Sequence, residues 1–240
     1  MTLAIVSALA DEQNGFRAAL RDARQVRRAQ RDFYVGQWQS QPVVLALSGI
    51  GKVAAASTAS TLIEAFGVRR MVLTGVAGGL DPGVQVGDTV IASDFLQHDL
   101  DASPLFERYV VPHYGCKTLA CDLALSDLLV LAVQRAGEIS PSRAASHRGL
   151  IVSGDRFIGD AQIALQLRQD ISSAGYRPLA VEMEGAALAQ VCRDHGVPFA
   201  AMRTISDRAD ETAHVDFQAF VQSVAGPRAL AVLRQLMALL

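Results

Sequence analysis

The sequence has few cysteines and few aromatic residues. It holds three cysteines and one tryptophan among 240 residues, and aromatic side chains make up 6%. The three cysteines, Cys116, Cys121 and Cys192, are too few and too odd in number for a disulfide framework in a chain of this length. Cys116 and Cys121 also lack the second pair of ligands that a zinc site needs. We therefore expect a protein of a reducing compartment, the cytoplasm.

An excess of one charge and a long apolar run are also missing. The 22 basic and 24 acidic residues give a net charge of −2, which provides no general attraction to nucleic acid or to an anionic membrane. No apolar run reaches the ~18 residues of a membrane span, and the apolar N-terminus lacks the basic residues of a signal peptide. Half of the residues are hydrophobic, which excludes disorder over most of the chain. We expect one domain over residues 1–240, with neither nucleic acid nor a membrane as partner.

The sequence lacks the common motifs of metal and nucleophile chemistry. The five histidines show no metal-ligand spacing, so no metal is expected, and a Gly-x-Ser-x-Gly elbow is missing. His98 and Asp99 are interpreted as part of a polar loop. Six arginines form a basic run between Arg17 and Arg31. We interpret this run as the solvated face of a helix rather than as a nucleic-acid patch.

Short apolar runs alternate with longer amphipathic stretches along the chain. Strands are predicted over Thr2–Leu9, Pro42–Ser48, Met71–Val76, Thr89–Ala92, Leu150–Ser153, Leu179–Met183 and Phe199–Ile205. Helices are predicted over Lys52–Phe66, Asp122–Ala136, Ala161–Ile171, Gly185–His195 and Phe217–Leu240, the last with a break or kink at Pro227. Continuous apolar runs are typical of strands buried on both faces. The sequence therefore predicts an α/β fold of three layers, α/β/α, around a central mixed, mostly parallel sheet.

Polar residues and glycines follow several of the predicted strands, where α/β folds bind their ligands. Gly49–Ala54 fits a loose dinucleotide-binding pattern, but the acidic residue expected about 20 positions later is missing. The segment is either a phosphate cradle or a tight turn, and we favour the turn. Thr74–Gly79 is a second glycine-rich strand exit, which is either a sharp turn or, as we favour, the floor of a ligand site.

Carboxylates stand at four of these strand ends, in Asp11–Glu12, at Asp155, in Glu182–Glu184 and at Asp207. Glu182 and Glu184 straddle a strand end and a helix start, where a preference of helix N-termini for anions explains Glu184 but not the inner Glu182. Paired carboxylates also accept hydrogen bonds from the vicinal hydroxyls of a sugar. Ser206 and Asp207 close another strand, either as a helix cap or as a general acid with its orienting hydroxyl.

Taken together, these motifs resemble the purine nucleoside phosphorylase and nucleosidase superfamily, most closely its methylthioadenosine/S-adenosylhomocysteine nucleosidases. The resemblance runs from about residue 3 to about residue 220. It rests on Ala8–Glu12 at the first strand end, SGIGKVAAA at 48–56, TGVAGGL at 74–80, VGDTV at 86–90, SGDRFI at 153–158, AVEMEGAALAQVC at 180–192 and VPFAAMRTISDRAD at 197–210. It implies a nucleoside phosphorylase-like fold, a homodimer, and hydrolysis of the N-glycosidic bond of adenine nucleosides without cofactor or metal, as in nucleoside catabolism and methionine salvage.

The resemblance also assigns roles to residues. Asp207 would protonate adenine N7 with help from Ser206, Glu12 would hold the attacking water with help from Arg203, and Glu184 would grip the ribose hydroxyls. The remaining substrate-binding positions are Ile50, Val76, Ala77, Gly78, Phe157, Ile158, Glu182, Met183 and Phe217. Leu105, Phe106 or Tyr109 would complete the 5′ pocket of the partner subunit.

Three departures and three other functions stay open. Val76 replaces a small hydroxyl residue of many relatives, Asp94–Cys121 differs from the common bacterial enzymes, and the segment after Glu12 matches poorly. The main alternative is a phosphate-dependent phosphorylase, but Thr74 stands where such enzymes carry an arginine, and Arg203 alone is a thin site for a dianion. A non-catalytic nucleoside-binding module and a nucleotide-dependent oxidoreductase are the remote alternatives.

Overall fold

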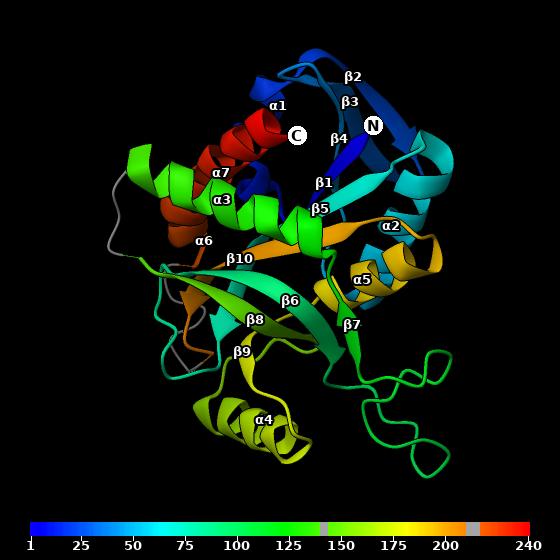
Figure 1. The fold of residues 1–240 in the computed structure, drawn as a ribbon, viewed down its shortest axis with the longest axis vertical. Coiled ribbons are helices and arrows are strands. Elements are labelled where there is room, and N and C mark those ends of the chain that lie inside the picture. Colours follow the sequence, from blue (N-terminus) through cyan, green and yellow to red (C-terminus); the bar gives the residue numbers. More distant parts are fainter. Residues whose placement is uncertain (140–143, 210–216) are drawn as a thin grey trace.

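The computed structural model describes residues 1–139, 144–209 and 217–240. Strands and helices alternate along much of the chain, as predicted (Figure 1). The strands are β1 (Leu3–Ser7), β2 (Arg21–Arg28), β3 (Arg31–Trp38), β4 (Gln41–Leu47), β5 (Arg70–Gly79), β6 (Thr89–Gln97), β7 (Thr118–Ala120), β8 (Ser146–Ser153), β9 (Pro178–Glu182) and β10 (Phe199–Asp207). The helices are α1 (Phe16–Ala19), α2 (Lys52–Phe66), α3 (Leu123–Ile139), α4 (Ala161–Ser173), α5 (Gly185–Asp194), α6 (Phe217–Phe220) and α7 (Gly226–Leu239), with a 3₁₀ turn η1 (Ala10–Gln13) and a π turn η2 (Val221–Ala225).

All strands belong to one mixed sheet, which confirms the predicted α/β class. Its order is β10-β6-β8-β9-β5-β1-β4-β3-β2, with β7 paired to β6. The long strand β5 also pairs with β10, so β5, β10, β6, β8 and β9 close into a ring. Parallel pairs join β4, β1, β5 and β10, and also β6, β8 and β9. Antiparallel pairs form the β2–β3–β4 edge and close the ring, so the sheet is more evenly mixed than predicted.

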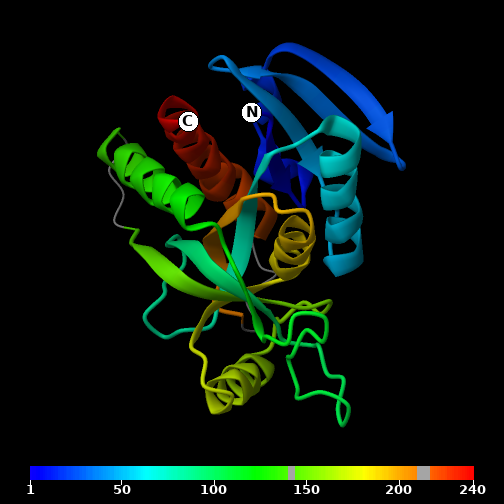
Figure 2. The ribbon, with the colours of Figure 1, turned by 45° about the vertical axis from the view of Figure 1, so that its right-hand side comes forward.

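Helices cover the sheet on both faces (Figure 2). One core cluster joins apolar residues of α2 and α5 to one face, through side chains such as Leu62 and Leu188. A second joins α3 and α7 to the other face, through side chains such as Leu129 and Leu233. Helix α4 packs on β8 and β9 in a third cluster. Burial of these apolar side chains is the main stabilising contribution to the layers.

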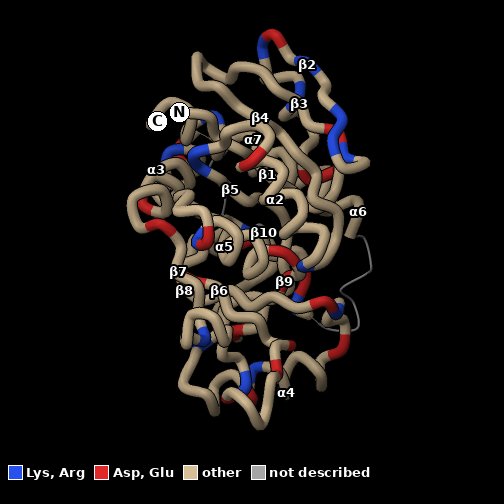
Figure 3. The backbone as a smooth tube through the Cα atoms, turned by 90° about the vertical axis from the view of Figure 1, so that its right-hand side faces the viewer, with Lys and Arg blue, Asp and Glu red and all other residues tan. Residues whose placement is uncertain are grey.

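The basic run is a strand and not a helix, which corrects the prediction for Arg17–Arg31. Only α1 is helical there, and the arginines continue into β2, which pairs with β3 through a hairpin (Figure 3). Ala29 and Gln30 both have positive φ angles, as the two-residue turns of twisted hairpins require. Strand β2 is exposed almost throughout and lies at the sheet edge, where charged side chains discourage pairing with another chain.

The C-terminal segment is helical on both sides of Pro227 instead of breaking there. Pro227 lies in the first turn of α7, where its missing N–H is tolerated. The π turn η2 directly before it absorbs the irregularity. Within the described part of the chain, no helix has both the length and the apolar character of a membrane-spanning helix.

Candidate active site

A pocket opens where strands β1, β5, β9 and β10 end, as the strand-end argument predicts. The open space in this pocket is about 610 Å³, including the solvent at its mouth. Its walls combine four carboxylates with apolar side chains. The lining residues are Ala8, Leu9, Glu12, Ile50, Val76, Ala77, Gly78, Arg156, Phe157, Ile158, Val181, Glu182, Met183, Glu184, Ser206, Asp207 and Phe217.

Glu12 is fixed by backbone donors on both of its oxygens. It lies on η1, directly after β1, and its Oε2 accepts hydrogen bonds from the N–H groups of Ala8 (2.8 Å) and Leu9 (2.9 Å). Its Oε1 accepts from the N–H of Val76 at 3.0 Å. Desolvation by burial raises the pKa of Glu12, although Arg203 and these N–H groups oppose the shift. A rigid carboxylate with a raised pKa is suited to accept a proton.

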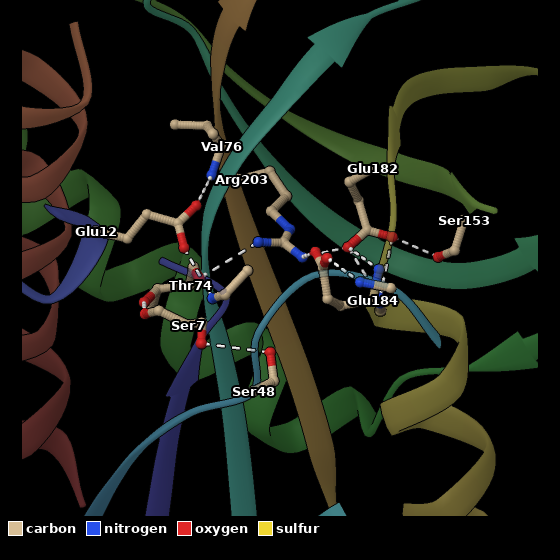
Figure 4. A network of polar contacts seen from close by, with 12 residues as sticks. Ser7, Glu12, Ser48, Thr74, Val76, Ser153, Glu182, Glu184 and Arg203 are labelled. Carbon is tan, nitrogen blue, oxygen red and sulfur yellow. Dashed lines mark hydrogen bonds and ion pairs between the residues drawn. The ribbon is translucent and has the colours of Figure 1, made fainter. Parts of the chain in front are cut away.

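Glu182 and Glu184 share one guanidinium, that of Arg203 (Figure 4). Glu182 also accepts hydrogen bonds from the Ser153 hydroxyl and from the N–H groups of Glu184 and Gly185. Glu182 therefore meets the first N–H groups of α5, so the alternative explanation by a helix N-terminus applies to Glu182 and not to Glu184. Both Glu182 oxygens have protein donors, so its carboxylate serves to hold Arg203 and the start of the helix.

Glu184 lines the pocket and faces the start of helix α2. Its Oε1 accepts a hydrogen bond from the N–H of Gly51 at 3.0 Å, and its Oε2 lies 3.1 Å from Nη2 of Arg203. Burial, followed by the negative charge of Glu182, raises the pKa of Glu184 to about 7, while Arg203 opposes this shift. Glu184 therefore gains or loses its proton near neutral pH.

Arg203 lies behind the pocket and not in its lining. Its side chain is 0% exposed, and its Nη1 donates to the carbonyl of Thr74 at 3.3 Å. Gly75 makes room for it, because a Cβ at this position would overlap both Arg203 and the carboxylate of Glu12. Arg203 therefore neutralises the carboxylates from beneath the floor, and it does not present a free cation to a ligand.

Asp207 ends β10 on the opposite wall of the pocket. Its Oδ2 accepts a hydrogen bond from the Ser206 hydroxyl at 2.6 Å, and its Oδ1 accepts from the N–H of Ala209 at 2.8 Å. Gly78 lies so close that a Cβ there would be 3.0 Å from Oδ1. The predicted pairing of Ser206 with Asp207 is present, whereas Asp210 of the same motif lies outside the described residues.

The N–H groups of the glycine turn before α2 are hydrogen-bonded to carboxylates of this chain. The N–H of Gly51 donates to Glu184, and the N–H of Lys52 donates to Asp155 at 2.7 Å. Gly49 and Gly51 have positive φ angles, as a tight strand-to-helix turn requires. Because carboxylates of the same chain accept these N–H groups, the turn is not an open phosphate cradle.

The apolar part of the lining is formed by residues from six separate segments. Every predicted site residue except Arg203 lines the pocket. Phe157 and Ile50 are 55% and 58% exposed, and Phe217 belongs to the same lining. Sequence reasoning missed Ala8, Leu9, Arg156 and Val181 as lining residues. Each of them adjoins a predicted residue or motif, and the sequence did not show that its side chain faces the pocket.

The residues predicted for a partner subunit do not line this pocket. Leu105 and Phe106 are exposed by 83% and 45% on the loop between β6 and β7. Tyr109 is only 2% exposed and packs in a core cluster with Leu96 and Leu150, so it leaves little surface for a contact with a partner. His98, interpreted as a residue of a polar loop, is also buried. Among the described residues, no group of three His, Cys, Asp or Glu side chains could hold a metal ion.

Comparison with known proteins assigns the family. The family model of the phosphorylase superfamily matches residues 2–238. A 5′-methylthioadenosine/S-adenosylhomocysteine nucleosidase of Halalkalibacterium halodurans is 34% identical over 224 residues, which is 93% of this chain and 92% of that protein. This chain belongs to the phosphorylase superfamily.

Solved structures place the chain within the nucleosidase family of this superfamily. The Neisseria meningitidis 5′-methylthioadenosine/S-adenosylhomocysteine nucleosidase, in complex with methylthio-immucillin-A, is 33% identical with a TM-score of 0.89, covering 100% of this chain and 99% of that chain. A nucleosidase of Colwellia psychrerythraea, in complex with adenine, is 32% identical with a TM-score of 0.87, covering 99% and 95%. The nucleoside phosphorylase-like fold is thereby confirmed.

Proposed function

We propose that this protein hydrolyses the N-glycosidic bond of adenine nucleosides, 5′-methylthioadenosine and S-adenosylhomocysteine, and releases adenine. The observation that carries the proposal is that Glu12, Glu184 and Asp207 line one pocket. Each is held in a different way, by backbone donors, by Arg203 and by Ser206 respectively. Relatives with the same fold bear the nucleosidase name, which supports this substrate class.

Asp207 is the general acid. Adenine is a poor leaving group as an anion, so it needs a proton as the bond to the ribose breaks. Asp207 gives its proton to N7 of the purine, and adenine leaves as a neutral molecule. The Ser206 hydroxyl, 2.6 Å from Oδ2, orients this carboxyl. A positioned acid of this kind contributes roughly 10²–10⁴-fold to a rate.

Glu12 holds the attacking water. Its carboxylate lies at the pocket floor, fixed by the N–H groups of Ala8, Leu9 and Val76. The water oxygen forms its bond to C1′ while the C1′–N9 bond breaks, and the water proton passes to Glu12. Arg203 balances the charge of these carboxylates from beneath the floor. Since Val76 takes part through its backbone N–H, a hydroxyl side chain at this position is not required for that contact.

Glu184 accepts hydrogen bonds from the ribose hydroxyls, with Met183 against the sugar. A carboxylate there also stabilises the positive charge that develops on the ribose as the bond breaks. Phe157 stacks on the purine and the backbone of Ile158 contacts its edge. Ile50 and Phe217 surround the 5′ substituent. All of these residues line the one pocket, which supports the assignment.

The charges around the pocket favour water over phosphate as the nucleophile. A phosphate dianion would face four carboxylates, and Arg203 is buried and already bound to Glu182 and Glu184. The N–H groups at the start of α2 are also bound to carboxylates. Phosphate recognition needs several free charged donors, and Arg156 is the one cation of the described pocket lining.

Product analysis tests the proposal. The pure protein is incubated with methylthioadenosine, S-adenosylhomocysteine, adenosine and inosine, each with and without phosphate. We expect adenine and the free sugar from the first two substrates at rates independent of phosphate. A sugar 1-phosphate formed only with phosphate would instead identify a phosphorylase.

A homodimer would complete the 5′ side of the site. The loop between β6 and β7 extends away from the body of the molecule (Figure 1) and exposes Leu105 and Phe106. Apolar side chains this exposed on one loop are typical of an interaction surface. They would cover the 5′ substituent bound by the partner subunit. We place the enzyme in the cytoplasm, where nucleoside catabolism takes place.

A further inference from the structure

Three segments that are distant in sequence meet at the first turn of α2 through charged groups. Lys52 begins the helix, Asp99 follows β6, and Asp155 follows β8. We call these three residues the Lys52 cluster. None of them lines the pocket, and the mechanism above uses none of them.

The cluster is a closed cycle of charge-assisted contacts. Nζ of Lys52 lies 2.6 Å from Oδ1 of Asp99, and Oδ2 of Asp99 accepts a hydrogen bond from the N–H of Asp155 at 2.9 Å. Oδ1 of Asp155 accepts from the N–H of Lys52 at 2.7 Å, which closes the cycle. Each member is therefore held by the other two.

The cluster is more than an exposed ion pair. The side chains of Lys52 and Asp99 are only 17% and 32% exposed, and Lys52 also donates to Gln97 at 3.1 Å. Burial alone would raise the pKa of Asp99, but the hydrogen bonds from Lys52 and from the N–H of Asp155 lower it. Exposed pairs contribute little to stability, whereas a partly buried cycle fixes the positions of its loops.

Two structural connections join the Lys52 cluster to the pocket. Asp155 and Lys52 adjoin residues that line the pocket: Phe157 lies two residues after Asp155, and Gly51, directly before Lys52, donates its N–H to Glu184. Gly51 is packed so closely that a Cβ would be 3.0 Å from Oδ1 of Asp155. Asp155 thus joins the segment that carries Phe157 to the turn that holds Glu184.

We propose that the Lys52 cluster positions residues 154–158 and Gly51 for purine and ribose binding, an inference that rests on the proposed function. The three residues are positioning residues and touch no substrate. Their loss should weaken substrate binding more than the chemical step, because Glu12 and Asp207 are held by other contacts and Glu184 keeps its contact with Arg203.

The test compares Asp99→Asn with a matched control, Asp127→Asn, which removes a carboxylate 2.6 Å from Arg148 elsewhere on the surface. For Asp99→Asn we expect KM for methylthioadenosine to rise about tenfold while kcat changes less than threefold. The control should match the wild type. In a Phe157→Ala background, the Asp99 substitution should raise KM much less, because one of its two routes to the substrate is gone.

Hydrogen exchange gives a second readout that does not depend on activity. The amides of residues 154–158 should exchange faster in Asp99→Asn than in the wild type, and Asp127→Asn should leave them unchanged. Unchanged exchange together with an unchanged KM would overturn the positioning role. A wild type that cleaves no adenine nucleoside would refute the proposed function instead, and the exchange result would still decide whether the cluster holds this loop.

Discussion

At the scale of single residues, the site is defined by what each carboxylate has around it. Glu182 is saturated by protein donors, Glu12 is fixed by backbone N–H groups, and Glu184 keeps a raised pKa beside Arg203. Three residues of the same chemical class therefore have different tasks. The difference comes from burial and donors and not from the residue type.

The role of Asp207 is tested by removing its proton. Asp207→Asn keeps the shape of the side chain but removes the acid, so kcat should fall by about 100-fold or more. The circular dichroism spectrum should be unchanged. Ser206→Ala serves as a milder variant, since it removes only the 2.6 Å hydrogen bond that orients Asp207. Its kcat should fall less than that of Asp207→Asn. An Asn variant that turns over at the wild-type rate would refute the assignment.

The raised pKa of Glu184 predicts how stability depends on pH. The folded pKa is about 7 against an ordinary 4.5, so the folded protein holds a proton that the unfolded chain releases. This contribution to stability is fully present below pH 4.5, is lost as the pH rises through about 7, and changes no further above that.

Chemical denaturation at several pH values measures this effect. The unfolding free energy of the wild type, relative to that of Glu184→Gln, should fall between pH 4.5 and 7 by at most about 1.4 kcal/mol per pH unit. Asp127→Asn should follow the wild-type profile. A difference between wild type and Glu184→Gln that does not vary with pH would contradict the raised pKa.

The sequence predicted which strand ends carry the site residues, but it did not predict the ion-pair partners of each charged side chain. The position of Glu12, Glu184 and Asp207 after apolar runs was enough to gather them. The burial of Arg203 was not predictable, because its counter-ions lie about twenty residues away and meet it only across the sheet. The buried state of Tyr109 likewise depends on β6 and β8 lying beside its loop.

At the scale of elements, the strands buried on both faces were predicted and the edge hairpin was not. Strands such as β1 and β10 read as continuous apolar runs because helices cover both of their sides. Strand β2 has no such pattern, since nearly all of its side chains face solvent. A run of arginines has no hydrophobic periodicity that could distinguish an exposed edge strand from a helix. The prediction of a helix was therefore wrong there.

In strand β5, Gly75 is a position where a larger residue should destabilise the fold. Gly75 leaves room for Arg203 and Glu12 to meet against the strand, and a methyl group there would overlap both. Gly75→Ala should therefore destabilise the protein by about 1–3 kcal/mol and lower activity with it. Gly67→Ala is the control, since Gly67 has a positive φ angle but nothing within 4 Å of its added Cβ. Equal melting temperatures for the two variants would contradict the packing argument.

At the scale of the whole molecule, the proposed dimer has a simple signature. Light scattering should give twice the chain mass of 25.6 kDa. Phe106→Asp should shift the protein toward the monomer and raise KM for methylthioadenosine, because the partner would no longer cover the 5′ group. Leu131→Asp, on the exposed side of α3, should leave mass and KM unchanged. A fully active wild-type monomer would refute this arrangement.

The ring of strands also has a consequence for folding. The pocket draws on residues from Ala8 to Phe217, and its inner contacts join chain segments as distant as Thr74 and Arg203. Such long-range closure is slow, because the entropy of large loops is lost before the contacts form. Activity should return only with the last refolding phase, so a partly synthesised or partly refolded chain would leave nucleosides intact.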